Sequence, residues 1–111
     1  MDCLFCNIIA GKITANIVAR TESITAFNDI TPQAPTHILI IPNQHYENMA
    51  EVASNDLSLV GELFKTAGEI ALESGLDSYR LNVNTGSAAG QSVFHAHLHL
   101  LGGRPFAWPP G

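Results

Sequence analysis

A run of alternating histidines and apolar residues constrains this chain more than any other feature. Residues 95–100 read His-Ala-His-Leu-His-Leu, and they hold three of the five histidines in the 111-residue sequence. Successive side chains of a β-strand point to opposite faces of a sheet. As a strand, the run places His95, His97 and His99 on one face and its apolar residues against a core. We therefore predict a row of imidazoles facing a metal or a catalytic pocket, rather than one histidine satisfied inside a core.

The composition limits the classes of partner that the chain can have. Hydrophobic residues make up 46% and charged residues 14% of the sequence, so we expect a single globular domain over residues 1–111, part of whose surface is buried against a second copy. The net charge of −5 argues against nucleic acid as a partner, although backbone N–H groups and imidazoles can still hold a small phosphate. No apolar run approaches the ~20 residues of a membrane span, and no signal peptide is visible. We expect a cytoplasmic protein without a membrane partner.

The rest of the chain predicts an α+β fold: about five strands in a mostly antiparallel sheet, with one long and one short helix. In the first half of the chain we expect a short helix at 4–10 ended by Gly11, a hairpin of strands at 17–20 and 24–27, an ordered loop at 28–35 and a buried strand at 36–41. A turn after residue 43 then leads into a short helical stretch, which is followed by a long helix ended by Gly75. The last elements are a strand at 79–84, a small-residue loop at 86–90 and the histidine strand.

The long helix is predicted from an apolar stripe at three- and four-residue steps. Ser54 serves as its N-cap, and Asp56 adds a carboxylate to the first turn. The residues of the stripe are Leu57, Val60, Leu63, Phe64, Ala67, Ile70 and Ala71. A helix of about 20 residues with such a stripe covers one face of a sheet.

The two cysteines, Cys3 and Cys6, are spaced as Cys-x-x-Cys near the N-terminus. Without a secretory signal, a structural disulfide is the weaker interpretation. Two thiolates at this spacing form half of a zinc site, which two histidines elsewhere in the chain could complete. A thioredoxin-like redox pair is the alternative, but the strand–helix context expected around such a pair is missing.

The histidine row supports two kinds of chemistry. A neutral imidazole can attack the phosphorus of a bound phosphate, while its neighbours stabilise the developing charge or protonate the leaving group. The loop at 86–90 would supply backbone N–H groups, and Ser92 a hydroxyl. Alternatively, three histidines in register could form an open catalytic zinc site. The spacing alone leaves both open.

Several separated motifs resemble the histidine triad (HIT) family, and specifically its histidine triad nucleotide-binding (Hint) branch. Residues 95–101, His-Ala-His-Leu-His-Leu-Leu, match the His-φ-His-φ-His-φ-φ signature, in which φ is an apolar residue. Residues 27–30, residues 32–37, Gly102-Gly103 and the closing Trp-Pro-Pro-Gly at 108–111 match in the same order, so that the resemblance covers nearly the whole chain. The Cys-x-x-Cys start is similar to that of bacterial members.

The resemblance implies a fold, a partner and an activity. It implies a homodimer in which two five-stranded sheets join into one of ten strands. It also implies a purine nucleoside phosphoramidase, which hydrolyses the P–N bond of adenosine or guanosine 5′-phosphoramidates, and often acyl adenylates, through a nucleotidyl-histidine intermediate. Catalysis needs no cofactor in such proteins. The preference between adenosine and guanosine is not visible in the sequence.

The resemblance also implies roles for particular residues. His97 would be the nucleophile, flanked by His95 and His99, with His37 orienting the row. Ser92, Gln91 and Asn84 would contact the α-phosphate, and Asp29, next to Asn28, would hold the ribose hydroxyls. The base would lie among Leu4, Phe5, Ile8, Phe27 and Ile30. Trp108 would reach the site of the partner subunit.

Plainer interpretations remain for several of these residues. Ile8, Phe27 and Ile30 are also typical of an ordinary core. Asp29 could only form a turn, Ser92 could only cap the loop, and Trp108 could fill a dimer interface.

In bacterial relatives with a Cys-x-x-Cys start, the pair joins two histidines in a structural zinc site. The resemblance makes His45 and His95 the ligands that complete Cys3 and Cys6 here. Three alternatives to a Hint phosphoramidase remain: the Fhit branch, which splits dinucleotide polyphosphates; the nucleotidyl-transferase branch; and a binding or scaffold module with residual turnover. The Trp-Pro-Pro-Gly ending and the small size favour the Hint branch, and the complete set of histidines favours an enzyme.

Overall fold

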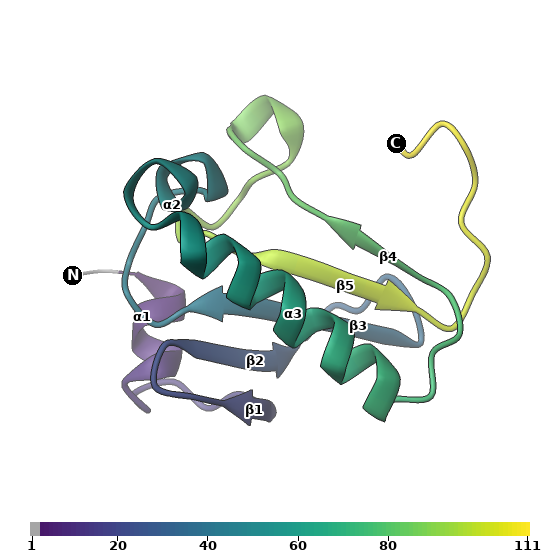
Figure 1. Cartoon of the computed structure of the whole chain (residues 1–111), viewed down its shortest axis with the longest axis horizontal. Helices are drawn as coiled ribbons and strands as arrows, with labels where there is room; N and C mark the ends of the chain where they lie inside the picture. Colours follow the sequence, from purple (N-terminus) through teal and green to yellow (C-terminus); the bar gives the residue numbers. More distant parts are fainter. Residues whose placement is uncertain (1–2) are drawn as a thin grey trace.

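The computed structural model describes residues 3–111 and contains one five-stranded antiparallel sheet with helices on it. The strands are β1 (Ile17–Arg20), β2 (Ile24–Asn28), β3 (Thr36–Pro42), β4 (Tyr79–Asn82) and β5 (Leu98–Gly102), in the spatial order β1-β2-β3-β5-β4. The helices are α1 (Leu4–Ile9), α2 (Met49–Asn55) and α3 (Leu57–Glu73), with a 3₁₀ turn η1 at Ser87–Ala89. Figure 1 shows α3 lying across the sheet, α1 at the left of the view, and the C-terminal tail leading away from the end of β5. The predicted α+β class is confirmed.

The two faces of the sheet have different partners because side chains alternate along each strand. Ile38 and Ile40 of β3 and Leu98 and Leu100 of β5 pack in the core formed with α2 and α3. On the opposite face, Phe27, Leu39 and Ile41 pack with Phe5 and Ile8 of α1. The imidazole row lies on this second face, and α1 is the helix that closes over it.

The predicted long helix is two helices, so Ser54 is not its N-cap. Asn48 caps α2 by accepting a hydrogen bond from the Glu51 N–H, and Asp56 caps α3 by accepting one from the Leu59 N–H. At Asp56 the backbone leaves the helical region, with φ −151° and ψ 81°, and the chain changes direction. The buried face of α3 consequently runs through Leu59 and Leu63, whereas Leu57 is 74% exposed and Phe64 is also exposed.

Other predicted boundaries hold with small shifts. Gly11 and Gly75 follow α1 and α3 at φ +78° and +73°, as expected for glycines that end helices. The strand predicted at 79–84 stops at Asn82, and β5 begins only at Leu98, so His95 and His97 precede it. Ala96, Leu98 and Leu100 still lie in the core with α3, so the predicted alternation of faces is correct. Over residues 3–111, none of the helices has the length and apolarity needed to cross a membrane.

Candidate functional site

The strand register places the imidazole row beside apolar side chains of α1. In antiparallel pairing, His99 of β5 lies opposite Leu39 of β3 and opposite Asn82 of β4. The rings of His97 and His99 are 4.9 Å apart between centroids, and the Phe5 ring meets the His97 ring edge-on at 5.2 Å. His97 is 8% exposed, so it is held among neighbours that fix its orientation.

Hydrogen bonds fix which nitrogen of His97 carries the proton. The Nδ1 of His97 lies 2.7 Å from the backbone carbonyl oxygen of His95. A carbonyl oxygen only accepts, so a neutral His97 must be protonated at Nδ1. The lone pair is then on Nε2. This arrangement presents a neutral imidazole nitrogen as a nucleophile.

A second chain of hydrogen bonds orders His37 and His99. The Gln33 N–H donates to Nδ1 of His37 at 3.0 Å, which leaves the proton of a neutral His37 on Nε2. That Nε2 is 2.9 Å from Nδ1 of His99 and 3.5 Å from the Asp29 carboxylate. His99 then carries its own proton on Nε2, and among the buried side-chain N and O atoms of residues 3–111 this Nε2 alone lacks a hydrogen-bond partner. A buried donor without a partner is costly, which is expected where a ligand completes the bond.

Burial keeps the imidazoles neutral. It lowers the pKa of His97, although the His95 carbonyl and the Asp29 charge act in the opposite direction. Burial, together with the charges of His97 and His37, lowers the pKa of His99 to about 4. The pKa of His37 is lowered by burial as well, against the charge of Asp29. At neutral pH the row therefore consists of uncharged rings.

A pocket of about 250 Å³ lies next to the row, between α1, the end of β2 and the loop before β5. Its lining includes eight residues that the sequence analysis singled out: Leu4, Phe5, Ile8, Phe27, Asn28, Asp29, Ile30 and Ser92. Phe27 and Ile8 are also buried in the core under α1, so a core role and a place in the wall of this pocket are compatible for these two residues. Ile30 is 92% exposed and lines only the pocket, which argues against a core role.

Asp29 combines a turn with a place in the pocket. One of its carboxylate oxygens accepts hydrogen bonds from the N–H and hydroxyl groups of Thr31, as in an Asx turn. The other oxygen faces Nε2 of His37. The turn therefore fixes a carboxylate where the pocket meets the imidazole row.

The loop before β5 is held by Gln91 rather than by Ser92. The Gln91 side chain is buried; it accepts from the Gly86 N–H and donates to the carbonyl oxygens of Glu47 and Val93. These bonds occupy its amide, so in this structure Gln91 orders the loop instead of pointing at a ligand. Ser92 is exposed, and its hydroxyl has no hydrogen bond within residues 3–111, so the capping alternative finds no support.

Sequence reasoning missed several residues of the pocket. Val93 and Leu39 line it, together with the segment from Ile13 to Ala15. Residues 13–15 form an irregular connection between α1 and β1, where no periodicity marks a buried face. For Val93, the sequence offered one signal of a place in the pocket: it lies between Ser92 and the histidines.

Asn84 and Trp108 lie away from this pocket. Asn84 lines a second pocket of about 240 Å³ on the other side of His99, together with His37. Trp108 lies in the C-terminal tail and is 83% exposed. In a single chain, Trp108 therefore covers no part of the histidine row.

The structure brings Cys3, Cys6, His45 and His95 together, with their candidate ligand atoms all within 4.8 Å of one another. Nδ1 of His95 lies 3.4 Å from Sγ of Cys3, 3.5 Å from Sγ of Cys6 and 3.1 Å from Nδ1 of His45. Bond lengths typical of a tetrahedral zinc place sulfur and nitrogen ligands ~3.6 Å apart and two nitrogens ~3.3 Å apart. The four side chains thus fit a zinc ion closely.

The protonation of this group also fits a metal. Nε2 of His95, a residue with 0% exposure, donates to the carbonyl of Pro42 at 2.8 Å, so its Nδ1 lone pair faces the sulfurs. Burial, with the neighbouring Cys3, raises the pKa of Cys6 to about 11, so a thiolate there requires a cation beside it. His95 is committed to this group, and it supports His97 through its backbone carbonyl.

Asp29, His37 and His99 also come within metal-ligating distance of one another. Here the protonation argues against an ion, because Nε2 of His37 must carry a proton while Nδ1 accepts from Gln33. The histidine row is therefore suited to hydrogen bonding and nucleophilic attack, and the Cys–His group to a metal.

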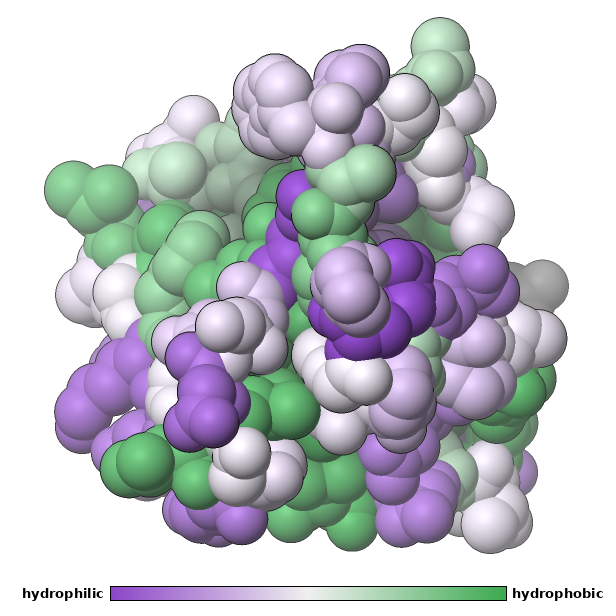
Figure 2. Space-filling model, turned by 90° about the vertical axis from the view of Figure 1, so that its right-hand side faces the viewer, coloured by the Kyte–Doolittle hydropathy of each residue, from purple (hydrophilic) through white to green (hydrophobic). Residues whose placement is uncertain are grey.

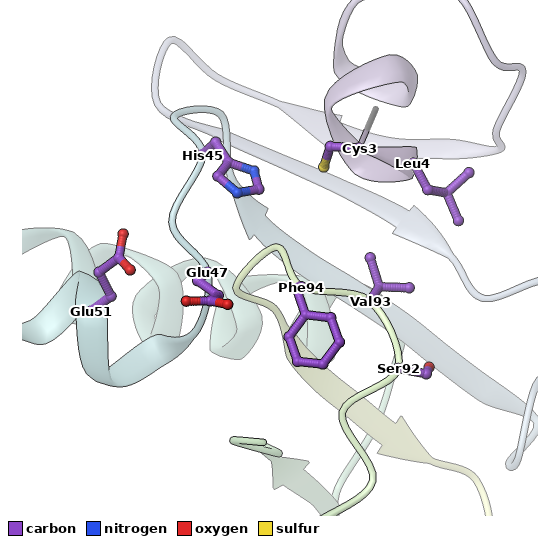
Figure 3. Close-up of a pocket in the computed structure, with 8 residues that line it drawn as sticks. All are labelled: Cys3, Leu4, His45, Glu47, Glu51, Ser92, Val93 and Phe94. Atoms are coloured by element: carbon purple, nitrogen blue, oxygen red, sulfur yellow. The ribbon is translucent and has the colours of Figure 1, made fainter. Parts of the chain in front are cut away.

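The Cys–His group forms part of the wall of a broad surface pocket of about 740 Å³. In Figure 3, Cys3 and His45 lie on one side of this pocket, Glu47 and Glu51 on another, and Ser92, Val93 and Phe94 along the loop before β5. Leu4, Ser92 and Val93 line this pocket and the smaller one beside the histidines. Helix α1 and this loop therefore connect the two sites physically.

The chain is similar to known proteins over most of its length. The HIT domain family model matches residues 10–106. The chain is 48% identical, over 99% of its length and 97% of the other, to an uncharacterised HIT-like protein of Synechococcus elongatus. It is 44% identical to the purine nucleoside phosphoramidase of Escherichia coli, over 94% of this chain and 89% of that one.

Solved structures show the same fold. A HIT family hydrolase from Legionella pneumophila superposes with a TM-score of 0.95 at 47% identity, covering 99% of this chain and 100% of that one. One from Clostridium thermocellum gives a TM-score of 0.91 at 40% identity, over 96% and 94% of the two chains. With a family match over most of its length and relatives well above 30% identity, the chain belongs to the HIT domain family.

Proposed function

We propose that this protein is a purine nucleoside phosphoramidase that hydrolyses the P–N bond of nucleoside 5′-phosphoramidates and releases the nucleoside monophosphate. The observation that carries the proposal is the neutral His97, whose Nδ1 is bound to the His95 carbonyl and whose Nε2 is left as a nucleophile beside an apolar pocket. The 44% identity to the Escherichia coli phosphoramidase supports the same activity.

In the proposed reaction, Nε2 of His97 attacks the phosphorus. A bond from Nε2 to phosphorus forms and the P–N bond breaks, with its electron pair going to the leaving nitrogen. The Nε2–H of His99 donates to a phosphoryl oxygen and stabilises its charge. The leaving amine takes up one proton from solvent, and His99 keeps its own proton throughout. Water then hydrolyses the nucleotidyl-histidine and restores His97.

The nucleotide would be held on both sides of the histidine row. We assign the base to the apolar part of the pocket under α1, with Phe5, Phe27 and Ile30, and the ribose hydroxyls to Asp29. An apolar pocket of this kind distinguishes purines poorly, so both adenosine and guanosine conjugates, and acyl adenylates, are within its reach. Ser92 and Asn84 would contact the α-phosphate, and Gln91 would hold the loop that carries Ser92.

We also propose a structural zinc ion held by Cys3, Cys6, His45 and His95. It would tie α1, which carries Leu4 and Phe5, to the loop before β5, and it would take no part in the chemical step.

A homodimer joined into a ten-stranded sheet is part of the same proposal, together with Trp108 at the partner's site and a cytoplasmic location. In residues 3–111, strands β1 and β4 are the edges of the sheet, and the exposed apolar side chains of Tyr79 and Val83 lie on or beside β4. These features support a partner at an edge of the sheet.

The alternative that shares this mechanism is a dinucleotide polyphosphate hydrolase of the Fhit type. It would act through the same histidine, so the substrate decides between the two. A binding module without turnover would need a defect in the row, and the described hydrogen bonds of His97 and His99 show none.

The proposal predicts turnover of adenosine 5′-phosphoramidate with an acid limb in kcat/KM below pH 6.5. The nucleophile is active when neutral, and because burial lowers the pKa of His97, activity is lost only as the pH falls through that lowered value. Steady-state hydrolysis from pH 4.5 to 8 measures this, with an adenosine dinucleotide polyphosphate as the comparison substrate. No hydrolysis of the phosphoramidate at any pH would contradict the proposed function, and an acid limb above pH 7 would contradict the assignment of a buried neutral imidazole.

A further inference from the structure

Two arginines gather beside the histidine row in a way that the proposed reaction does not explain. Arg80 of β4 and Arg104 after β5 both line the pocket of about 240 Å³ that contains His37, His99 and Asn84. They are two of only five lysines and arginines in a chain with a net charge of −5. Figure 2 views the side of the molecule where the C-terminal tail lies, and strongly hydrophilic groups sit there next to hydrophobic ones.

The strand pairing and the tail fix both arginines in place. Arg80 lies opposite Leu101 of β5, and Arg104 follows Leu101 by three residues in the chain. Both guanidinium groups lie over the ring of Phe106: the central carbon of Arg80 is 5.1 Å from the ring centroid, and that of Arg104 is 4.3 Å from it. Such stacking orders a guanidinium without using its N–H donors.

The donors of both arginines are only partly used. Nη2 of Arg80 donates to the Ala107 carbonyl, while Nε and Nη1 of Arg104 donate to the carbonyls of Gln33 and Pro105. Nε and Nη1 of Arg80 and Nη2 of Arg104 have no acceptor within residues 3–111. Among residues 3–111, neither arginine has a carboxylate within 4.0 Å. The two ion pairs of these residues, His37–Asp29 and Lys65–Glu69, involve other side chains.

Two oriented guanidinium groups without a carboxylate, in an acidic protein, are suited to an anion. The position of this anion follows from the two pockets. The arginine pocket lies on the other side of His99 from the pocket under α1, which we assign to the nucleoside. The group that leaves the phosphorus would therefore lie near the arginines. We propose that Arg80 and Arg104 form a subsite for an anionic group on the leaving amine, and so favour phosphoramidates whose amine carries a carboxylate or a phosphoryl group. This inference rests on the proposed function for its substrate.

The chemical step is the one given above, and the two arginines hold the leaving amine through its carboxylate or phosphoryl group. The bond from Nε2 of His97 to phosphorus forms, the P–N bond breaks, and the amine departs with the electron pair and one proton taken from solvent. The arginines take and give no proton; they only orient the leaving group. The subsite therefore acts on substrate choice.

The test compares adenosine 5′-phosphoramidates with leaving amines of similar size: glycine, glycinamide and aminomethylphosphonate. For the wild type, we expect kcat/KM for glycine to exceed that for glycinamide by about tenfold, from one charge-assisted contact. The phosphonate arm tells whether the subsite prefers a carboxylate or a phosphoryl group. Arg80→Gln and Arg104→Gln should each bring the ratio of glycine to glycinamide toward one, and the lysine variants should retain part of it. Arg20→Gln is the matched control and should leave the ratio unchanged, because Arg20 is an exposed arginine of β1 that donates to the Ile9 carbonyl of α1 and lines no part of this pocket.

A ratio near one in the wild type, or a ratio that survives both glutamine variants, would overturn the subsite while leaving the phosphoramidase assignment intact. Calorimetric titration of the same compounds into His97→Ala gives a readout that needs no turnover. If the wild type hydrolyses none of the compounds but this variant still prefers the anionic ones, the subsite stands and the proposed reaction fails. If binding shows no preference either, the subsite is wrong.

Discussion

Replacing His97 by alanine is expected to lower kcat/KM for adenosine 5′-phosphoramidate by at least about 10³-fold, because it removes the group that forms the covalent intermediate. The loss should appear in kcat, since the proposal assigns the contacts to base and ribose to other residues of the pocket, on α1 and at Asp29 and Ile30. Steady-state kinetics of the wild type and the variant measure it.

Adenosine monophosphate binding is the control for this variant. His97 packs against Phe5, so alanine could loosen α1, and calorimetric affinity for the monophosphate within a few-fold of the wild type would exclude that cause. His97→Gln, which fills more of the space, should be as inactive as His97→Ala. Retention of activity by either variant would show that another group attacks the phosphorus.

Replacing both cysteines by serine is expected to have the largest effect on stability. Serine lacks the thiolate that zinc prefers, and a metal present at a thousandfold over its Kd contributes about 4 kcal/mol to the free energy of unfolding. The variant should therefore lose bound zinc and unfold at a markedly lower temperature. Cys3 and Cys6 flank Leu4 and Phe5, which line the pocket that we assign to the nucleoside. Loss of the metal should therefore disturb this pocket, and we expect KM to rise more than kcat falls.

Calorimetric unfolding and elemental analysis of the purified protein, with and without a chelator, check this result. Asn7→Ser is a matched control, since Asn7 lies on α1 but outside the Cys–His group. A wild type that holds no zinc, and a double variant as stable as Asn7→Ser, would contradict the metal site. A chelator that abolishes activity without affecting the fold would instead assign a metal to the chemistry.

Much of the site could be predicted because its signals are local in sequence. The alternation from His95 to Leu100 determined which side chains face the core, even though β5 begins only at Leu98. Alternation depends on the extended backbone and not on the hydrogen-bonded ladder, so the faces were correct where the boundary was not.

The helix boundary could not be found in this way. Ser54 and Asp56 are both good N-caps, and the choice depends on the packing of Met49 and Val52, which anchor a separate helix in the core. The loop-ordering hydrogen bonds of Gln91 could not be foreseen either, because one of its partners, the Glu47 carbonyl, is 44 residues away. Arg80 and Arg104 likewise become neighbours only through the pairing of β4 with β5.

The most direct test of the central claim is to trap the covalent intermediate on the wild-type protein. The protein is mixed with adenosine 5′-phosphoramidate, quenched in alkaline denaturant within one turnover, digested and analysed by mass spectrometry. We expect one nucleotidyl group per active chain, on His97, forming no more slowly than kcat and absent from His97→Ala. Turnover without such an adduct, or an adduct on another residue, would contradict the account of His97 as the nucleophile.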